Sequence, residues 1–171
     1  MPLTDERLKL DSMKAYTERR TCMTTPILTQ NETDNLIDMR KRRIDDKEWQ
    51  YPGLGGGISV PLVSFDERER FILDIRRSRI NLQRGSYQSR GRRVVVLVRL
   101  CFGSTSHTNP DGNEVGLPHI HIYREGYGDK WAYPVTAAEF GNLGDQWQTF
   151  QDFMQHCNIV EAPNIVRGLS A

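Results

Sequence analysis

Hydrophobic and polar residues alternate with a period of two along the middle of the chain, which is the pattern of half-buried β-strands. On this basis we predict six strands, over residues 58–63, 71–75, 80–82, 94–101, 119–124 and 130–135. The fourth of these is almost continuously apolar, as is typical of a central strand covered on both faces. Because the connections are short and rich in turn-forming residues, we expect an antiparallel sheet of five to six strands.

Two segments with helical periodicity flank the predicted sheet. Thr29 and Glu32 have the spacing of a capping box, and the residues that follow predict a helix over 30–44 with a basic last turn. Near the other end, Asp145 is the expected N-cap of an amphipathic helix. Its apolar stripe is formed by Trp147, Phe150, Phe153, Met154 and Cys157. The predicted fold class is α+β, with an N-terminal helix and a C-terminal amphipathic helix packed on the sheet.

The length of the chain, 171 residues, is typical of one domain, and its net charge of +1 favours neither a nucleic acid nor a membrane as partner. Residues 1–27 are polar and poor in large apolar side chains. We therefore expect a flexible N-terminal extension over residues 1–27 and a single α+β domain over residues 28–171.

The cysteines and the apolar runs indicate the cellular compartment in which we expect the protein. Three widely spaced cysteines form neither a disulfide framework nor a Cys-x-x-Cys metal motif, and Cys101 is expected to be a small buried hydrophobe. No apolar run has the length of a membrane-spanning helix, and the N-terminus lacks the apolar core of a secretory signal. We expect a cytoplasmic protein without a membrane partner.

Three of the four histidines lie within 15 residues, from His107 to His121. In a strand, His119, His121 and Tyr123 would share one face while the intervening isoleucines point to the core. We expect this histidine face to be open, with His107 joining it from the preceding loop. Imidazole titrates near neutral pH and also binds metals, so the cluster suits acid–base or phosphate-binding work as well as metal ligation.

The histidines admit two further interpretations. His107, His119 and His121 could hold one metal ion, with Asp111 or Glu114 as a fourth ligand. They could equally be structural residues or contacts to a partner protein, because a His-x-His pair also occurs on ordinary strand surfaces.

Basic charge is concentrated upstream of the histidines. Eight arginines and no acidic residue lie between Arg76 and Arg99, and the guanidinium fork suits phosphate recognition. Aromatic residues nearby could stack on bases of RNA. The candidate substrate-binding residues are Arg90, Arg124, Lys130, Trp131 and Tyr87. Arginines on a solvent-exposed strand face, paired with the acids of residues 66–69, would give the same pattern.

The chain resembles a family of small bacterial and prophage-borne proteins of unknown function over about residues 28–165. The resemblance is carried by SYQSR (86–90), HTNPDG (107–112), PHIHIYREGYGDKWA (118–132) and FMQHCNI (153–159). This family implies no established activity. The basic strand, the Asp-Gly loop and the histidine pair are also similar, more loosely, to small ribonuclease toxins of toxin–antitoxin modules.

These observations lead to three functional hypotheses. The first is a metal-independent ribonuclease or phosphodiesterase without a cofactor, a toxin of a mobile element or toxin–antitoxin module with RNA as substrate and a cognate antitoxin as partner. Its catalytic residues would be His119 and His121, assisted by Tyr123 and His107. The second is a non-enzymatic phage or prophage protein that binds and inhibits a host defence complex. The third is a histidine-coordinated metal-binding domain.

Overall fold

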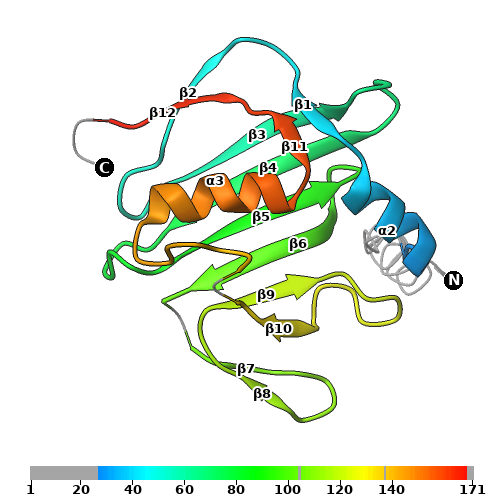
Figure 1. Cartoon of the computed structure of the whole chain (residues 1–171), viewed down its shortest axis with the longest axis vertical. Helices are drawn as coiled ribbons and strands as arrows, with labels where there is room; N and C mark the ends of the chain where they lie inside the picture. The colour runs from blue at the N-terminus through cyan, green and yellow to red at the C-terminus, as the bar shows by residue number, and fades with distance from the viewer. Residues whose placement is uncertain (1–26, 104, 137, 169–171) are drawn as a thin grey trace, which may run out of the picture.

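A large, mostly antiparallel sheet forms the centre of the molecule (Figure 1). The computed structural model describes residues 27–103, 105–136 and 138–168. From one edge to the other, the eight strands of the main sheet are β10 (Ala132–Pro134), β9 (His119–Ile122), β6 (Val95–Phe102), β5 (Gly85–Gly91), β4 (Arg70–Arg77), β3 (Gly57–Ser64), β1 (Lys41–Arg43) and β11 (Ile159–Glu161). Neighbouring strands are antiparallel except β1 and β11, which run parallel.

The α+β class and the antiparallel sheet are confirmed, but eight strands exceed the five to six predicted. The last two strands at one side of the sheet, β1 and β11, have only three residues each, too few to show a period. The central strand β5 is largely polar and was missed. The strand predicted over 80–82 is wrong: the segment is a turn in which Ile80 is 96% exposed and Ser78 Oγ accepts hydrogen bonds from two backbone N–H groups.

The first described helix, α2 (Gln30–Asp38), begins as predicted and ends early. The capping box is present, because Thr29 and Glu32 bind each other's backbone N–H groups. The predicted continuation to residue 44 is wrong, since residues 41–43 form β1. Lys41 explains the change: its side chain is buried, and its Nζ donates to backbone carbonyls at the ends of both helices.

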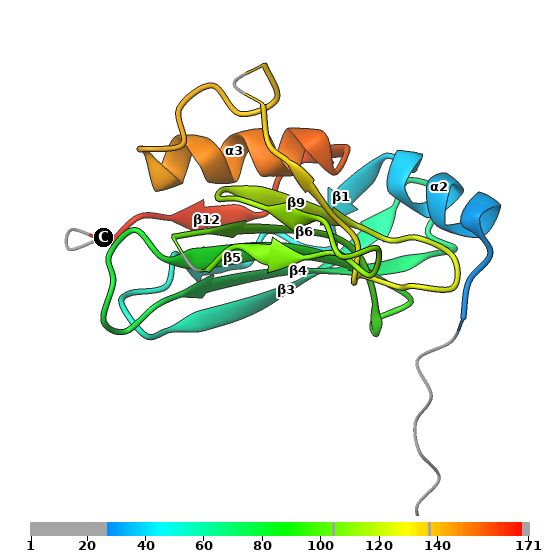
Figure 2. The same ribbon diagram turned by 90° about the horizontal axis from the view of Figure 1, so that it is seen from below.

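The C-terminal helix α3 (Gln146–His156) covers one face of the sheet, with α2 on the same side (Figure 2). Asp145 is its N-cap, as predicted, and accepts hydrogen bonds from two backbone N–H groups. Phe150 and Phe153 are fully buried, and their ring centroids lie 5.3 and 5.8 Å from that of Tyr87 on β5. The hydrophobic core therefore lies between α3 and the sheet, and the apolar stripe predicted for this helix is confirmed.

The other face of the sheet is polar. Tyr87 on β5 and Leu100 on β6 point into the core, so the residues next to them in the chain point the opposite way. This second face, called the polar face below, carries Ser86 and Gln88 from β5 and Arg99 and Cys101 from β6.

Two small sheets complete the fold. β2 (Glu48–Gln50) pairs in parallel with β12 (Asn164–Val166), and β7 (His107–Thr108) forms a hairpin with β8 (Glu114–Val115). The Asn109 side chain joins this hairpin to the edge strand β10, because its amide donates to the carbonyl of Ala132 at 2.9 Å and accepts from the N–H of Ala132 at 2.8 Å. The hairpin is thereby held close to β9. The flexible extension predicted over 1–27 falls almost wholly on residues 1–26, which lie outside the described residues.

Candidate metal centre

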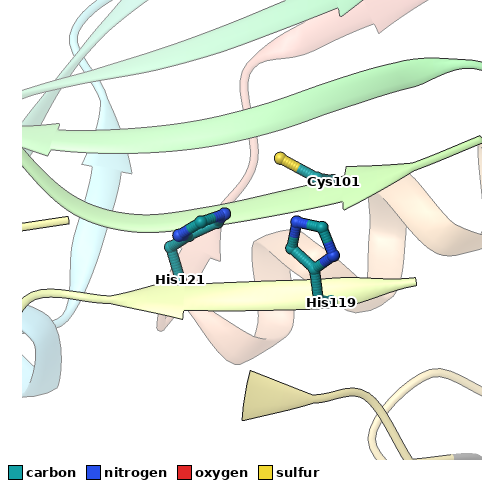
Figure 3. A group of neighbouring side chains, drawn as sticks. All are labelled: Cys101, His119 and His121. Atoms are coloured by element: carbon teal, nitrogen blue, oxygen red, sulfur yellow. The ribbon is translucent and has the colours of Figure 1, made fainter. Parts of the chain in front are cut away.

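Three side chains from β6 and β9 meet on the polar face of the sheet. Cys101 is paired with His119 in the antiparallel ladder, and Arg99 is paired with His121. Residues directly opposite each other in such a ladder share a face, as do residues two apart in one strand. The thiol of Cys101 and the rings of His119 and His121 therefore gather on the same side of the sheet (Figure 3). We call these three residues the trio.

The trio is compact and largely shielded from solvent. One potential ligand atom from each residue lies within 4.8 Å of those of the other two, and the two histidine ring centroids are 5.0 Å apart. His119 is 3% and His121 is 2% exposed, while Cys101 is half-buried. The expectation of an open histidine face is thus wrong, because side chains and the β7–β8 hairpin cover it.

Hydrogen bonds leave nitrogen lone pairs available on both rings. His119 Nδ1 donates to the carbonyl of Gly116 at 2.9 Å, which leaves its Nε2 as the unprotonated nitrogen. His121 Nδ1 is buried and has no hydrogen-bond partner among the residues that the structure describes. A ring held by a carbonyl through one nitrogen, with the other free, is the usual state of a metal-binding histidine.

Burial keeps the two imidazoles uncharged. Burial, together with the smaller effect of the neighbouring positive charge of Arg99, lowers the pKa of His121 to about 3. Burial also lowers the pKa of His119 and raises that of the Cys101 thiol. Both rings are therefore neutral at pH 7, the form that binds metals, and ligation by Cys101 would displace the thiol proton.

His107 joins the trio from β7, as predicted. Its ring centroid lies 4.7 Å from that of His121 and 5.7 Å from that of His119. Its Nε2 is 2.8 Å from the carbonyl oxygen of Lys130, to which it donates, so its Nδ1 remains available. The carboxylates considered as a fourth ligand do not join: Asp111 accepts from Asn113, and Glu114 accepts from the Ser106 hydroxyl.

Tyr123 does not lie with the histidines, contrary to our expectation. It follows the end of β9 at Ile122, so the alternation of faces no longer applies to it. Its ring is in the hydrophobic core, and its hydroxyl binds both the N–H and the carbonyl of Leu28 at 3.0 Å. Tyr123 thus anchors the segment that leads into α2.

The predicted substrate-binding residues are scattered. Tyr87 is fully buried beneath α3, on the opposite face from the trio, so its assignment as a base-stacking residue is wrong. Arg90 is engaged by the buried carboxylate of Asp74, with an Nε–Oδ2 distance of 2.7 Å. Of the segments that carry predicted substrate-binding residues, only the connection that follows β9 lies near the trio.

In that connection, the Arg124 guanidinium lies 4.0 Å from the ring centroid of Trp131, which also packs edge-on against Tyr127. Lys130, an exposed residue, contributes the carbonyl that holds His107. The structure thus brings Arg124 and Trp131 together, and only the backbone of Lys130 is shown to contact a histidine.

Sequence reasoning missed Cys101 as a member of the cluster. It ends an apolar run, so the sequence predicts a buried hydrophobic residue at this position. In the structure it alternates with the core residues Leu100 and Phe102 and therefore faces the polar side. The one signal in the sequence is this alternation. It becomes informative only once β6 is known to pair with β9 in this register.

Over the described residues, the fold and the trio together define an α+β protein with two helices on one face of the sheet and a cysteine–histidine cluster on the other. The chain belongs to a family of unknown function, DUF6978, whose model matches residues 28–159. This match confirms the resemblance to an uncharacterised family, while the prophage origin and the likeness to ribonuclease toxins stay predictions.

No curated protein and no solved structure matches the chain. Among the described residues, no helix is both long and apolar enough to cross a membrane.

Proposed function

We propose that this protein binds a transition-metal ion, Zn²⁺ above all, through Cys101, His119 and His121. The observation that carries the proposal is the convergence of one thiol and two imidazoles within 4.8 Å. In addition, a buried ring nitrogen of His121 has no hydrogen-bond partner in the described part of the chain. Tetrahedral zinc has ligands at about 2.0–2.3 Å, so its ligand atoms lie roughly 3.3–3.8 Å apart. Adjustments of side-chain rotamers by about 1 Å would close the trio around the ion.

The donor set favours zinc over other common ions. Sulfur and imidazole ligands suit Zn²⁺ and copper, whereas Mg²⁺ and Ca²⁺ require oxygen ligands, and the trio contains no carboxylate. Three protein ligands leave a fourth position of the tetrahedron. His107, whose ring centroid lies 4.7 Å from that of His121, is a side chain that could fill it, and solvent or a substrate is the alternative.

Burial of the histidines supports metal ligation over proton transfer. A general acid must carry a proton near the working pH, yet the pKa of His121 is lowered to about 3 and that of His119 is also lowered. The metal-independent ribonuclease and the inhibitor of a defence complex stay hypotheses. The ribonuclease predicts RNA cleavage after chelation, which the experiment below includes.

The test is metal loading of the full chain. Protein stripped with a chelator is dialysed against Zn²⁺, and bound metal is counted by elemental analysis. We expect one ion per chain in the wild type and a loss of at least tenfold in affinity in His119→Ala and in His121→Ala. His156→Ala is the matched control, because this fourth histidine lies on α3, away from the trio. Cys22→Ser tests whether a cysteine outside the described residues contributes.

Cobalt provides a second readout. Co²⁺ in the same site should show a thiolate-to-metal charge-transfer band that disappears in Cys101→Ser and persists in Cys22→Ser. Wild-type protein that binds no metal, or variants of the trio that bind it as well as the wild type, would overturn the proposal. Cleavage of RNA by chelator-treated protein would favour the ribonuclease instead.

A further inference from the structure

A cavity of about 500 Å³ opens beside the trio. It lies where β4, β5 and β6 run side by side and receives residues from the connection between β4 and β5. Its described lining contains no carboxylate. The side chains that matter to the argument are Arg76, Arg84, Ser86, Arg99 and Cys101. The cavity is therefore strongly basic.

The positive charge of the cavity is only partly neutralised. Arg99 pairs with Asp129, with an Nη1–Oδ2 distance of 2.8 Å. Arg76 and Arg84 form no ion pair with any residue in the described part of the chain. Arg77, which also lines the cavity, forms none either, whereas Arg90, farther along β5, is bound to an aspartate. Among the described residues, three arginines without an ion-pair partner thus line one cavity.

Arg99 offers a second, independent indication of a ligand. Its Nε is buried and has no hydrogen-bond partner among the described residues, although its Nη1 is held by Asp129. A buried donor without an acceptor is destabilising, and native proteins rarely leave one unsatisfied. An oxyanion in the cavity would supply the missing acceptor.

We propose that this cavity binds a phosphate monoester, whose phosphate contacts Arg76, Arg84 and Arg99. A phosphate monoester carries a charge close to −2 at neutral pH, so it neutralises more of the positive charge of this cavity than a carboxylate does. Guanidinium groups bind phosphate oxygens through paired hydrogen bonds. A volume of about 500 Å³ lies within the range of small-molecule sites, which favours a ligand of nucleotide size over a polymer.

One cross-strand row joins the cavity to the trio. Arg76 is paired with Ser86, Ser86 with Cys101, and Cys101 with His119, so these four residues share the polar face. Cys101 both lines the cavity and belongs to the trio. A metal ion held by the trio would therefore adjoin the bound phosphate. This last relation rests on the proposed metal function, whereas the phosphate site itself does not.

The test measures phosphate binding with and without metal. Inorganic phosphate and a nucleoside 5′-monophosphate are titrated calorimetrically into the full chain, in its chelator-treated and its zinc-treated forms. We expect both probes to bind both forms, and Arg76→Gln combined with Arg84→Gln to weaken binding at least about tenfold. Arg68→Gln is the matched control, since Arg68 is an exposed arginine outside the cavity. Thermal melts verify that all variants are folded.

The outcomes separate the two proposals. Zinc stoichiometry should be unchanged in the Arg76→Gln/Arg84→Gln variant. Wild-type protein that binds phosphate but no zinc would support the phosphate site and overturn the metal site. Wild-type protein that binds neither probe in either form would overturn the phosphate site. Equal weakening by Arg68→Gln would also overturn it, because the effect would then be one of overall charge. If a single-stranded RNA binds tightly and the monophosphate does not displace it at constant ionic strength, the proposed phosphate-monoester site would be overturned in favour of an RNA-binding surface.

Discussion

Cys101 stands directly opposite His119 in the antiparallel ladder between β6 and β9. This pairing places a thiol and an imidazole from segments 18 positions apart on the same face of the sheet. A slip of one residue in the register would turn one of the two side chains into the core. The site is therefore a consequence of the strand register, and its chemistry depends on a fold that keeps this register.

Zinc should stabilise the wild-type protein. An ion that binds only the folded chain raises the free energy of unfolding by about 2.7 kcal/mol at a concentration one hundred times its dissociation constant. Urea denaturation with zinc and with chelator measures the gain. The double variant His119→Ala/His121→Ala should show none of it, and an equal gain in that variant would place the bound zinc elsewhere.

Replacing Lys41 with methionine should destabilise the fold strongly. The buried ammonium donates to the carbonyls of Ile37 and Met39 at 2.8 Å and of Cys157 at 2.9 Å, and so joins the ends of both helices. Each carbonyl left without a donor costs about 1–3 kcal/mol, but removal of the buried ammonium also removes the cost of its desolvation. We therefore expect a net loss of roughly 2–4 kcal/mol. Urea denaturation checks this. Lys47→Met, at an exposed lysine, is the control and should change the stability by less than about 0.5 kcal/mol.

Tyr87→Phe separates a structural role from a role in ligand binding. The Tyr87 hydroxyl lies 2.7 Å from that of Tyr51 and donates to the carbonyl of Gln146 at 2.8 Å. Loss of this buried hydroxyl should lower the free energy of unfolding by about 1–2 kcal/mol. Zinc and phosphate binding by the folded variant should be unchanged, because Tyr87 lies beneath α3. A selective loss of phosphate binding at unchanged stability would contradict this assignment.

The stability of the protein should fall in mild acid, in part through His156. Burial lowers the pKa of His156 in the folded state, while the nearby Glu139 raises it by a smaller amount. Below the ordinary histidine pKa of about 6.5, the unfolded chain therefore binds the proton more readily than the folded chain does. Stability is retained above that pH and is lost as the pH falls below it.

His156→Gln tests this contribution, because glutamine does not titrate. Chemical denaturation at pH 7.5 and at pH 5.5, in chelator, should show a smaller loss of stability in the variant than in the wild type. An equal loss in both proteins would mean that His156 takes no part in the acid response.

Local patterns predicted much of the fold. The capping box of Thr29 and Glu32 and the N-cap Asp145 were recognised because each satisfies backbone groups within its own helical turn. The strands β3, β4 and β6 were recognised because burial of one or both faces leaves a pattern in the residues themselves. The clustering of His107, His119 and His121 was likewise a short-range property.

Features that depend on distant segments were not predictable in this way. The end of α2 depends on Lys41, whose ammonium also binds a carbonyl of Cys157, 116 positions away in the chain. The polar strand β5 is central because both its neighbours pair with it, although few of its side chains are apolar. Residue propensities and hydrophobic periodicity are local properties, so they indicate neither the long-range hydrogen bond of Lys41 nor the strand pairing of β5.

The sequence by itself determined which residues can carry chemistry, namely three nearby histidines and a run of arginines. It also determined where both described helices begin and where five strands of the main sheet lie. Only the tertiary structure decided how these residues combine. The register of β6 against β9 added Cys101 to the histidines, and the pairing of β4, β5 and β6 brought Arg76 and Arg99 to one cavity. The physical reason is that hydrogen bonds between strands join residues far apart in the chain, so the face and the neighbours of each side chain are set by its partner strand.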